Sequence, residues 1–586
     1  MEAATRYPEA TAIEVGNRSW TYEEVAGRVE ATHLLLREAG VALGDRIGIW
    51  MDRSSEAIVG VLAAWSLGSA YVPLSPETLN PGLQTHFPLS RLARMFDDIA
   101  PRVVLTDTDA AIPGWDGPVV QIASQSLVQP ATRRHAHISE IGNPPAYHIY
   151  TSGTTGAPKA VTISQESVLW LRGALNSSIY DHEQRPALRR TLNAPLGFDP
   201  SVQQLVGLLD GATLVVVPAR VRTHGRELLN FLRSSRIEVL DTTPAQLRLL
   251  VDAGLGEVGD YPRLILCGGA NLDRRLWMDL ADMPTRKTYN LYGVTEATVD
   301  STCALVSGSE PTIGVPLPGV SLSIGDPESA ATDQAGQSDT LWISGDSVAV
   351  GYWNRPHLTA QRFNTDASGR TWYDTGDIAS LTADGRYQIH GRSDRQVKIR
   401  SHRVELDEVE NVLNLHHTIS SAAVIAVSGN LVANVVSEKS STLDIVELRR
   451  HLRSHVPDYM VPQEIKSVES LPLTPNGKID YGRLTADTEA ESTPSPTTAP
   501  TGDSGSASTI SLLRDAWAEA LPEDMVLHPD SDFFESGGDS LSIIAMLTTL
   551  EDVTGTELPL ADLVERPIFG DHVRVLDELL QSTTER

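Results

Sequence analysis

The sequence has 586 residues, of which 47 are Lys or Arg and 76 are Asp or Glu, giving a formal net charge of −29. A chain of this length forms several domains, and its acidity disfavours nucleic acid or an anionic membrane as the main partner. Cys267 and Cys303 provide neither a disulfide framework nor a zinc site, and the N-terminus lacks the features of a signal peptide. We therefore expect a soluble, cytoplasmic protein.

The first half of the chain alternates between predicted helices and short apolar strands. A capping box at Thr21 begins a helix that ends near Gly40, and a strand follows over residues 46–50. The uncharged stretch 57–74 is nearly long enough to span a bilayer, but Gly, Ser and Pro divide it into a buried helix and a buried strand. Similar segments occupy residues 91–99, 103–105, 226–232, 237–240 and 264–267. This pattern predicts a multidomain α/β fold in which parallel sheet is flanked by helices.

The second half of the chain contains three segments that differ in composition and in hydrophobic pattern. Residues 310–387 have short strand-like runs with glycine turns, which predict a small β-rich subdomain. Residues 487–508 are mainly Ser, Thr, Pro, Gly, Ala and acids, so we expect a disordered linker there. Residues 509–586 contain 4 basic and 17 acidic residues and predict a small acidic helical bundle. One face of its first helix is apolar, comprising Leu512, Leu513, Ala516, Trp517 and Leu521, and a second helix begins near Ser540.

Residues 150–159, with the sequence YTSGTTGAPK, directly precede an apolar run. Glycines let amide N–H groups converge on phosphate oxygens, hydroxyls add donors, and the lysine adds a positive charge. A Ser/Thr/Gly run is often only a flexible loop, and the spacing is not that of a Walker loop. The full string resembles the phosphate-binding loop of the adenylate-forming superfamily, which includes acyl-CoA synthetases, luciferases and the adenylation domains of nonribosomal peptide synthetases. The resemblance implies that ATP is bound by Thr151, Ser152, Gly153, Thr154, Thr155, Gly156 and Lys159.

Two further motifs are similar to nucleotide-binding segments of this superfamily. In residues 290–296 (NLYGVTE) the resemblance implies that Tyr292 stacks on adenine and that Glu296 holds Mg²⁺, which prefers carboxylate and phosphate oxygens. In residues 373–377 (YDTGD) it implies that Asp377 accepts hydrogen bonds from the ribose. The remaining residues implied at the ATP or catalytic site are Gly268, Gly269, Ala270, Asn290, Gly293, Thr295 and Arg392. The sequence departs from the usual pattern at three positions. Ser75 stands where the superfamily usually has Asp, Val294 where it usually has Pro, and Asp374 where it usually has Arg or Lys.

The resemblance also implies a mobile C-terminal subdomain with a catalytic lysine. Residues 391–399 (GRSDRQVKI) resemble the hinge, with Asp394 as its pivot, and Ser401 replaces a usual glycine near the expected route of the thiol. Lys478, in NGKID, matches the lysine that neutralises charge between the substrate carboxylate and the α-phosphate. The implied domains are an adenylation core (1–393), a small α+β subdomain (394–486), the linker (487–508) and a four-helix-bundle carrier domain (509–582).

The motif FDPS at residues 198–201 indicates which class of carboxylic acid is activated. In peptide synthetases the aspartate at this position pairs with an α-ammonium group, and a carboxylate facing no ammonium would be buried unpaired. Asp199 therefore implies an α-amino acid rather than an aryl or fatty acid. The resemblance implies a side-chain pocket lined by Pro200, Gln203, Asp241, Ile265, Cys267, Leu291, Val299 and Asp300. Two acids and an amide there predict a hydrogen-bond-donating substrate side chain, either glutamine-like or basic (Lys, ornithine or Arg).

Residues 532–541 (DFFESGGDSL) resemble the attachment motif of peptidyl carrier domains. The resemblance implies that Ser540 bears 4′-phosphopantetheine at a helix N-terminus, where the helix dipole favours a phosphodiester. The whole chain is then expected to activate an amino acid with Mg-ATP and load it onto its own carrier, as in antibiotic and other secondary-metabolite biosynthesis.

Such a didomain implies further protein partners. They are a phosphopantetheinyl transferase and a downstream condensation or tailoring enzyme. The second is expected because no condensation or thioesterase domain is recognised in the sequence. Some relatives also need an MbtH-like protein. Two alternatives remain: a free-standing acyl- or aryl-CoA ligase, and a degenerate noncatalytic scaffold. Asp199 and the carrier motif disfavour the first, whereas the presence of Lys159, Glu296, Asp377 and Lys478 disfavours the second.

Overall fold

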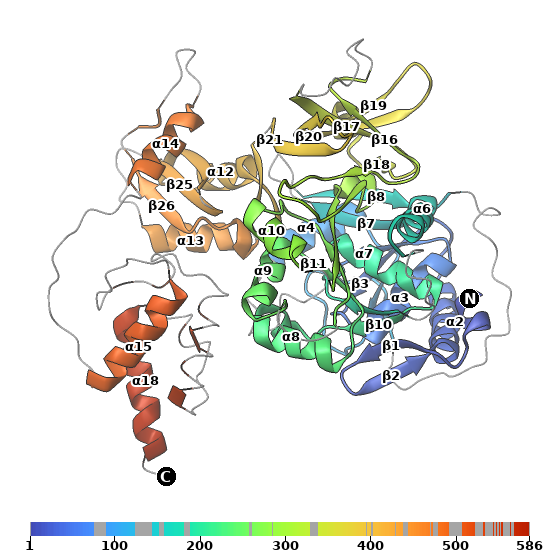
Figure 1. Ribbon diagram of the computed structural model, residues 1–586, viewed down its shortest axis with the longest axis horizontal. Coiled ribbons are helices and arrows are strands. Elements are labelled where there is room, and N and C mark those ends of the chain that lie inside the picture. The colour runs from blue at the N-terminus through green and yellow to red at the C-terminus, as the bar shows by residue number, and fades with distance from the viewer. Residues whose placement is uncertain are drawn as a thin grey trace. The chain divides into compact units, whose positions relative to one another are not determined.

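The computed structural model divides the chain into two compact units (Figure 1). The first comprises residues 1–77 and 88–408, and the second comprises residues 78–87 and 409–586. The structure describes residues 2–584 apart from 75–88, 123–142, 152–157, 181–187, 257–260, 284, 328–337, 394, 400–401, 428, 438–443, 469, 473–478, 492–506, 522–530, 532, 534–542, 544–545, 548–549, 551–552, 555–562 and 564–567. Among these described residues, no helix is both long and apolar enough to cross a membrane.

Two large sheets form the centre of the first unit. The nine-stranded sheet has the order β15 (Val315–Pro316), β14 (Thr302–Leu305), β13 (Lys287–Tyr292), β12 (Leu264–Cys267), β11 (Val239–Thr242), β9 (Arg189–Leu192), β10 (Thr213–Val216), β1 (Thr11–Val15), β2 (Arg18–Thr21). The seven-stranded sheet has the order β18 (Gly351–Tyr352), β8 (Lys159–Ser164), β7 (Pro145–Thr151), β4 (Ala70–Pro73), β3 (Arg46–Trp50), β5 (Val103–Thr106), β6 (Val119–Gln121). Strands inside both sheets pair in parallel, and antiparallel pairs such as β13–β14 and β7–β8 lie towards the ends, so the predicted helix-flanked parallel sheet is confirmed.

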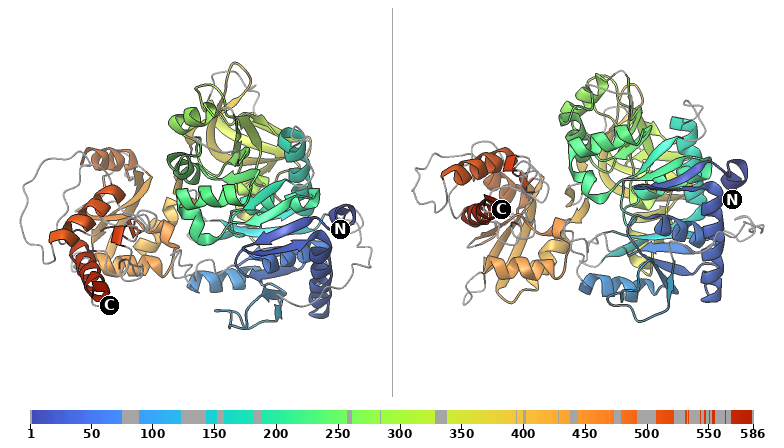
Figure 2. Two further views of the ribbon diagram at one scale, coloured as in Figure 1. Left: turned by 60° about the horizontal axis from the view of Figure 1, so that its bottom comes forward. Right: turned by 90° about the horizontal axis from the view of Figure 1, so that it is seen from below.

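Helices cover these sheets and separate them (Figure 2). They are α1 (Glu2–Arg6), α2 (Tyr22–Glu38), α3 (Ser55–Ser66), α4 (Leu89–Ile99), α6 (Gln165–Leu175), η1 (Asn176–Tyr180), α7 (Pro200–Leu205), η3 (Val206–Asp210), η4 (Ala219–Thr223), α8 (Gly225–Ser234), α9 (Pro244–Asp252), α10 (Arg274–Ala281), η5 (Thr295–Ala297) and α11 (Pro356–Arg362). The α3 helix contacts β3 and β4 of one sheet and β1 of the other. The stretch 57–74 therefore forms a buried helix and strand, as the sequence predicts.

The N-terminus of α2 shows how local sequence fixes an element. The hydroxyl of Thr21 accepts a hydrogen bond from the amide of Glu24 (3.2 Å), and the Glu24 carboxylate accepts one from the amide of Thr21 (2.8 Å). A cap of this kind stabilises a helix by about 1 kcal/mol. The helix ends at Glu38, and Gly40 follows with φ = 81°, a conformation that favours glycine.

A smaller antiparallel sheet confirms the β-rich character predicted for residues 310–387. It contains β16 (Val320–Ile324), β17 (Ser338–Gly345), β20 (Thr371–Leu381), β19 (Phe363–Thr365) and β21 (Tyr387–Arg392). A hairpin of β22 (Gln396–Ile399) and β23 (His402–Glu405) follows and belongs to the first unit. This hairpin and β20 each carry residues of the candidate site.

The second unit contains a small α+β part and the described portion of the C-terminal helices. The first consists of β24 (Ile419–Val427), β25 (Asn430–Ser437) and β26 (Glu464–Ser467), with α13 (Ile445–Arg453), η6 (Asp458–Met460), α14 (Tyr481–Glu491) and most of α12 (Leu406–Asn414). The α14 helix continues to Glu491 because residues 485–491 (TADTEAE) contain good helix formers and Leu484 anchors the helix on β24 and β25. Its last five residues thus fall within the span predicted as a linker.

The C-terminal helices whose bounds the structure describes are α15 (Ala507–Ala520) and α18 (Phe569–Thr584). Leu513, Ala516, Trp517 and Leu521 of the predicted apolar face are buried, and Leu512 is partly buried against them. The Trp517 indole donates a hydrogen bond to Nδ1 of the fully buried His572 (3.2 Å). Residues 534–542, including Ser540 and the start of the second predicted helix, lie outside the described part of the chain.

Candidate active site

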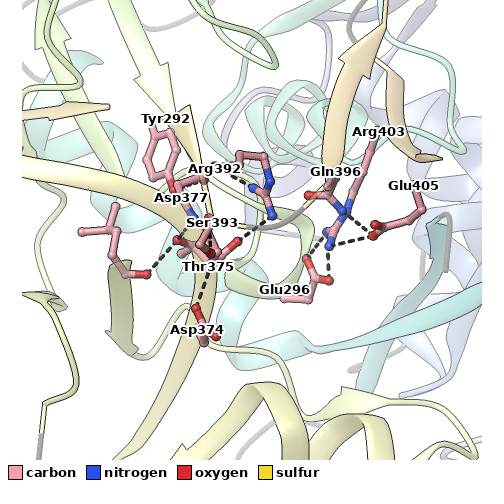
Figure 3. Close-up of polar contacts among 12 residues, drawn as sticks. Tyr292, Glu296, Asp374, Thr375, Asp377, Arg392, Ser393, Gln396, Arg403 and Glu405 are labelled. Carbon is pink, nitrogen blue, oxygen red and sulfur yellow. Dashed lines mark hydrogen bonds and ion pairs between the residues drawn. The ribbon is translucent and has the colours of Figure 1, made fainter. Parts of the chain in front are cut away.

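Two residues predicted at the nucleotide site, Tyr292 and Arg392, converge on the carboxylate of a third, Asp377 on β20 (Figure 3). Tyr292, at the end of β13, donates its hydroxyl to Asp377 Oδ2 at 2.6 Å. Arg392, at the end of β21, donates to Oδ1 at 2.6 Å and to the carbonyl of Thr375 at 3.0 Å. Burial, together with the charge of Asp377, raises the pKa of Tyr292 well above its usual value, so the phenol remains a donor. The arrangement fixes both oxygens of Asp377 at the junction of two sheets.

Glu296 lies on the η5 turn directly after β13, and its side chain is completely buried. Its Oε1 accepts a hydrogen bond from the hydroxyl of Tyr352 (2.7 Å), and Lys159 Nζ lies 3.8 Å away. Arg403 Nη1 is 2.9 Å from Oε1 and 2.8 Å from Oε2 (Figure 3). Burial alone would raise the pKa of Glu296, but the positive charges of Arg403 and Lys159 outweigh it and lower the pKa to about 2.

Lys159 begins β8 at the end of the predicted phosphate loop and is also buried. Its ammonium lies 4.5 Å from the ring centre of Tyr352 and 3.3 Å from the hydroxyl of that residue. Burial and the nearby charge of Arg403 lower the pKa of Lys159 to about 8, despite the opposing effect of Glu296. The lysine is therefore a cation at neutral pH, held where phosphate is predicted to bind.

Asp199 directly precedes α7, whose first helical residue is Pro200, and its side chain makes no capping hydrogen bond to the helix. Its carboxyl is hydrogen-bonded to Thr295, next to Glu296. Burial raises the pKa of Asp199 to about 6, and the charge of Glu296 contributes to the rise. The structure thus brings the residue predicted to hold an amino group beside the turn predicted to hold the metal.

Two further carboxyls lack a full set of partners: Asp241 is half-buried with Oδ2 enclosed, and Asp300 is buried. Burial raises the pKa of Asp241 to about 8, although the Gln204 side chain is hydrogen-bonded to it. The pKa of Asp300 is raised well above its usual value by burial and then by the charges of Asp241 and Asp199. Oδ2 of each residue and Nε2 of Gln203 are buried and have no hydrogen-bond partner. We call Asp199, Asp241 and Asp300 the acidic cluster.

The backbone around this cluster is tightly constrained. A side chain at Gly293 would place its Cβ 1.9 Å from the carbonyl oxygen of Val299. Thr298 and Val299 adopt left-handed conformations (φ = 51° and 69°), which are strained for β-branched residues. Gly269, in the segment predicted beside adenine, also has a left-handed conformation (φ = 82°).

The other predicted site residues have varied surroundings. Asn290 donates to the carbonyl of Thr312 (2.8 Å), and Thr151 Oγ1 lies 3.5 Å from the carbonyl oxygen of Lys159. Ile265 and Cys267 are fully buried in an apolar cluster with Trp277, whereas Leu291 and Val299 belong to the larger core cluster. Gly268 lies close to the backbone of Leu291, and Ala270 follows in the same loop. The predicted residues that lie outside the described part of the chain are Ser152, Gly153, Thr154, Thr155, Gly156, Asp394, Lys478 and Ser540, together with the departures Ser75 and Ser401.

Arg403 and Tyr352 are site residues that the sequence analysis missed. Tyr352 follows a glycine in an ordinary turn pattern, and Arg403 lies 107 residues from its carboxylate partner, so no local spacing connects them. Asp374, which departs from the usual basic residue, accepts a hydrogen bond from Arg362 (3.2 Å). Arg362 of α11 thus supplies a positive charge next to Asp374.

Three family models match successive parts of the chain. Residues 1–353 match the family of AMP-binding enzymes, residues 408–478 match the C-terminal domain of AMP-binding enzymes, and residues 511–573 match the phosphopantetheine attachment site family. The chain is 34% identical to one of the linear gramicidin synthase proteins of Brevibacillus parabrevis, with 98% of this chain and 7% of that protein covered. It is 31% identical to a surfactin synthase protein of Bacillus subtilis, with 97% and 16% covered. The chain thus spans less than a fifth of the length of these two relatives.

Solved structures show the same architecture. A holo four-domain nonribosomal peptide synthetase bound to AMP and glycine is 30% identical, with a TM-score of 0.59 over 98% of this chain and 42% of that chain. A holo protein with adenylation and carrier domains has the same fold, with 23% identity and a TM-score of 0.78 over 100% of this chain and 97% of that chain. The chain belongs to the family of AMP-binding enzymes and joins an adenylation core to a phosphopantetheine carrier, the module arrangement of nonribosomal peptide synthetases.

Proposed function

We propose that the protein activates a basic α-amino acid with ATP and transfers it to the phosphopantetheine thiol of its own carrier. The acidic cluster carries the proposal, because two buried carboxyls and the half-buried Asp241 act on one another electrostatically beside the residues that surround Glu296. A buried carboxylate without a cation is unfavourable by several kcal/mol. A substrate with two positive groups would neutralise the cluster, which an aryl or fatty acid cannot do.

Asp199 is proposed to bind the α-ammonium group of the substrate. Its pKa of about 6 in the free enzyme is raised chiefly by burial, despite the hydrogen bond from Thr295. An ammonium ion at this position would favour the ionised form and replace the solvation lost on burial. The substrate carboxylate would then lie towards Glu296 and Lys159, where the phosphates of ATP are predicted to bind.

Asp241 and Asp300 are proposed to select the side chain. A glutamine amide could accept a hydrogen bond from Gln203 and donate to one acid, but it would leave the other acid protonated or unpaired. An ammonium or guanidinium group has three or five donors and a charge that lowers the cost of ionising both acids. Lysine, ornithine and arginine are therefore favoured over glutamine.

In the activation step, a substrate carboxylate oxygen attacks the α-phosphorus of ATP, and pyrophosphate leaves. Lys478 is proposed to neutralise the charge that develops there, and Lys478→Ala should lose at least the ~2.7–4 kcal/mol typical of one preorganised donor. Glu296 is the buried acid next to Lys159, and no group of three or more metal-binding side chains occurs among the described residues. This donor set fits Mg²⁺ held by one carboxylate together with phosphate oxygens, provided that Arg403 leaves the carboxylate. When bound, the ion would neutralise phosphate charge.

In the transfer step, the thiolate of the pantetheine on Ser540 attacks the acyl carbon, and AMP leaves with the bonding electron pair. Asp377, which is bonded to Tyr292 and Arg392, is proposed to hold the ribose through both steps. A phosphopantetheinyl transferase must first modify Ser540. A condensation or tailoring enzyme would accept the aminoacyl group, and an MbtH-like protein is a further proposed partner.

Amino-acid-dependent exchange of pyrophosphate into ATP tests this proposal. Lysine, ornithine, arginine, glutamine, phenylalanine, benzoate and a fatty acid should be compared at equal concentration, and the basic amino acids should be preferred. Preference for glutamine would contradict the side-chain assignment but retain the α-amino assignment. Exchange with benzoate or fatty acid alone would favour a CoA ligase, and exchange with none would favour a noncatalytic scaffold.

A further inference from the structure

Arg403 occupies the carboxylate that is proposed to hold the metal. A single nitrogen, Nη1, lies within 2.9 Å of both Glu296 oxygens, and Tyr352 donates to one of them. Gln396 and Glu405 are hydrogen-bonded to each other on the same hairpin, and Glu405 lies 3.8 Å from Arg403 Nη2 (Figure 3). The arginine is thus held from one side by its own hairpin and from the other by Glu296.

A magnesium ion and the Arg403 guanidinium would compete for this carboxylate. Mg²⁺ binds oxygen at roughly 2.0–2.1 Å and needs near-ideal octahedral geometry, so it requires a lone pair that faces open space. Here the arginine covers both oxygens, and its charge would lie within a few ångströms of the ion, next to the further charge of Lys159. Either cation neutralises the buried carboxylate, and each disfavours binding of the other.

The hairpin that carries Arg403 contacts the rest of the site at two other places. The ring of His402 lies 5.9 Å from that of Phe198, the residue before Asp199. The charge of Lys398 on β22 acts on both Asp199 and Asp377. The hairpin of β22 and β23 therefore contacts the proposed metal-holding carboxylate, lies beside the residue before Asp199, and carries a charge that acts on the residues proposed to hold the amino group and the ribose.

We propose that Arg403 replaces Mg²⁺ on Glu296 after pyrophosphate has left, and that this exchange of cations positions the hairpin for the transfer step. The inference rests on the proposed function, because it takes Glu296 as the metal-holding carboxylate. Departure of the metal with pyrophosphate would leave Glu296 buried without a counter-ion, which is strongly unfavourable. Arg403 removes that cost only when the hairpin is seated. Arg403 is a positioning residue and takes no part in bond making or breaking.

Binding of a nucleotide analogue to the full-length protein tests the exchange. The probe is α,β-methylene-ATP with Mg²⁺, which cannot release pyrophosphate, and metal-free AMP serves as the comparison ligand. Removing the competing cation by Arg403→Gln should tighten binding of the Mg-analogue about ten- to hundredfold and leave AMP affinity within about twofold. Arg403→Lys should give an intermediate value. The matched control is Arg386→Gln, which removes the same charge from an exposed pair with Asp384 and should behave as wild type.

Hydrogen–deuterium exchange over residues 396–405 supplies a second readout that does not depend on turnover. In wild type, the Mg-analogue should speed exchange of these amides relative to the AMP complex. In Arg403→Gln and in Glu296→Gln, exchange should already be fast with AMP alone. Single-turnover loading of the carrier should be slowed by a larger factor than pyrophosphate exchange in Arg403→Gln, whereas a general loss of structure would slow both by the same factor.

The outcomes separate this inference from the function on which it rests. Unchanged affinity for the Mg-analogue in Arg403→Gln, with unchanged hairpin exchange and a wild-type enzyme that activates amino acids, would overturn the cation exchange alone. A wild-type enzyme that supports no amino-acid-dependent pyrophosphate exchange would overturn the proposed function and this inference with it.

Discussion

Replacing Asp241 with Asn should stabilise the ligand-free protein while impairing its recognition of a basic substrate. Asp241 is half-buried, its Oδ2 is enclosed without a partner, and its pKa in the folded protein is raised to about 8 from an ordinary 3.8. Because the folded pKa is the higher one, the contribution of Asp241 to the free energy of unfolding is most favourable below about pH 4 and becomes less favourable as the pH rises towards 8. Asparagine has a similar shape and no ionisation cost.

The magnitude follows from the difference between the two pKa values. Each pH unit above 3.8 contributes about 1.36 kcal/mol, so at pH 7 the linkage destabilises the folded protein by about 4 kcal/mol. Unfolding entropy of about 2.1 cal/mol/K per residue, applied to a first unit of about 400 residues, converts this into a Tm increase of about 5 °C. Asp300 would also lose a like-charged neighbour, which acts in the same direction.

Differential scanning calorimetry of wild type and Asp241→Asn across about pH 4 to 8.5 measures the effect. The Tm difference should be near zero at about pH 4 and should grow steadily towards pH 8. Asp210→Asn is a suitable control, because Asp210 already pairs with Arg172 at 2.7 Å and its loss should not raise Tm. A Tm difference that is absent, negative or independent of pH would refute the assignment of Asp241 as a half-buried acid without a cation. In parallel, kcat/KM for the basic amino acid should decrease.

Burial and the charge of Arg403 lower the pKa of Lys159 to about 8. The lysine should therefore lose its positive charge, and KM for ATP in pyrophosphate exchange should increase, between about pH 8 and 9.5. Lys159→Arg should abolish that increase. Asp377→Asn should weaken AMP binding in calorimetry about ten- to hundredfold, since a charged acceptor for the ribose is lost; wild-type affinity would argue against the ribose contact. Ser540→Ala should retain amino-acid-dependent exchange but show no mass increase after treatment with a phosphopantetheinyl transferase. A modified Ser540→Ala protein would place the attachment elsewhere.

Elements with strong local signals could be predicted from the sequence. The capping box at Thr21 is present as expected, and the uncharged stretch 57–74 is divided into α3 and β4 by its glycine and serine residues. The start of the predicted linker was less accurate, because helix-forming residues extend α14 to Glu491. A composition rich in small and acidic residues does not by itself distinguish a solvent-exposed helix end from a linker.

The candidate site was predictable only where its residues belong to compact motifs. Tyr292 and Asp377 come from two such motifs, and the structure joins them with a hydrogen bond of 2.6 Å. Arg403 carries no comparable signal, because its role depends on a hairpin folding back on a turn that lies 107 residues earlier in the chain. Likewise, carboxyls at positions 241 and 300 can be read from the sequence, but the absence of partners for their oxygens depends on three-dimensional packing.

The left-handed turn at Thr298 and Val299 has a consequence for protein engineering. The hydroxyl of Thr298 donates to the carbonyl of Ser347 at 2.6 Å, and Gly293 lets the chain pass directly against Val299, so this hydrogen bond and close backbone packing set the frame that presents residue 300. Libraries that seek a new amino-acid preference should therefore randomise positions 241 and 300 and keep 293 and 298 fixed. Chemistry could then be varied there without rebuilding the scaffold.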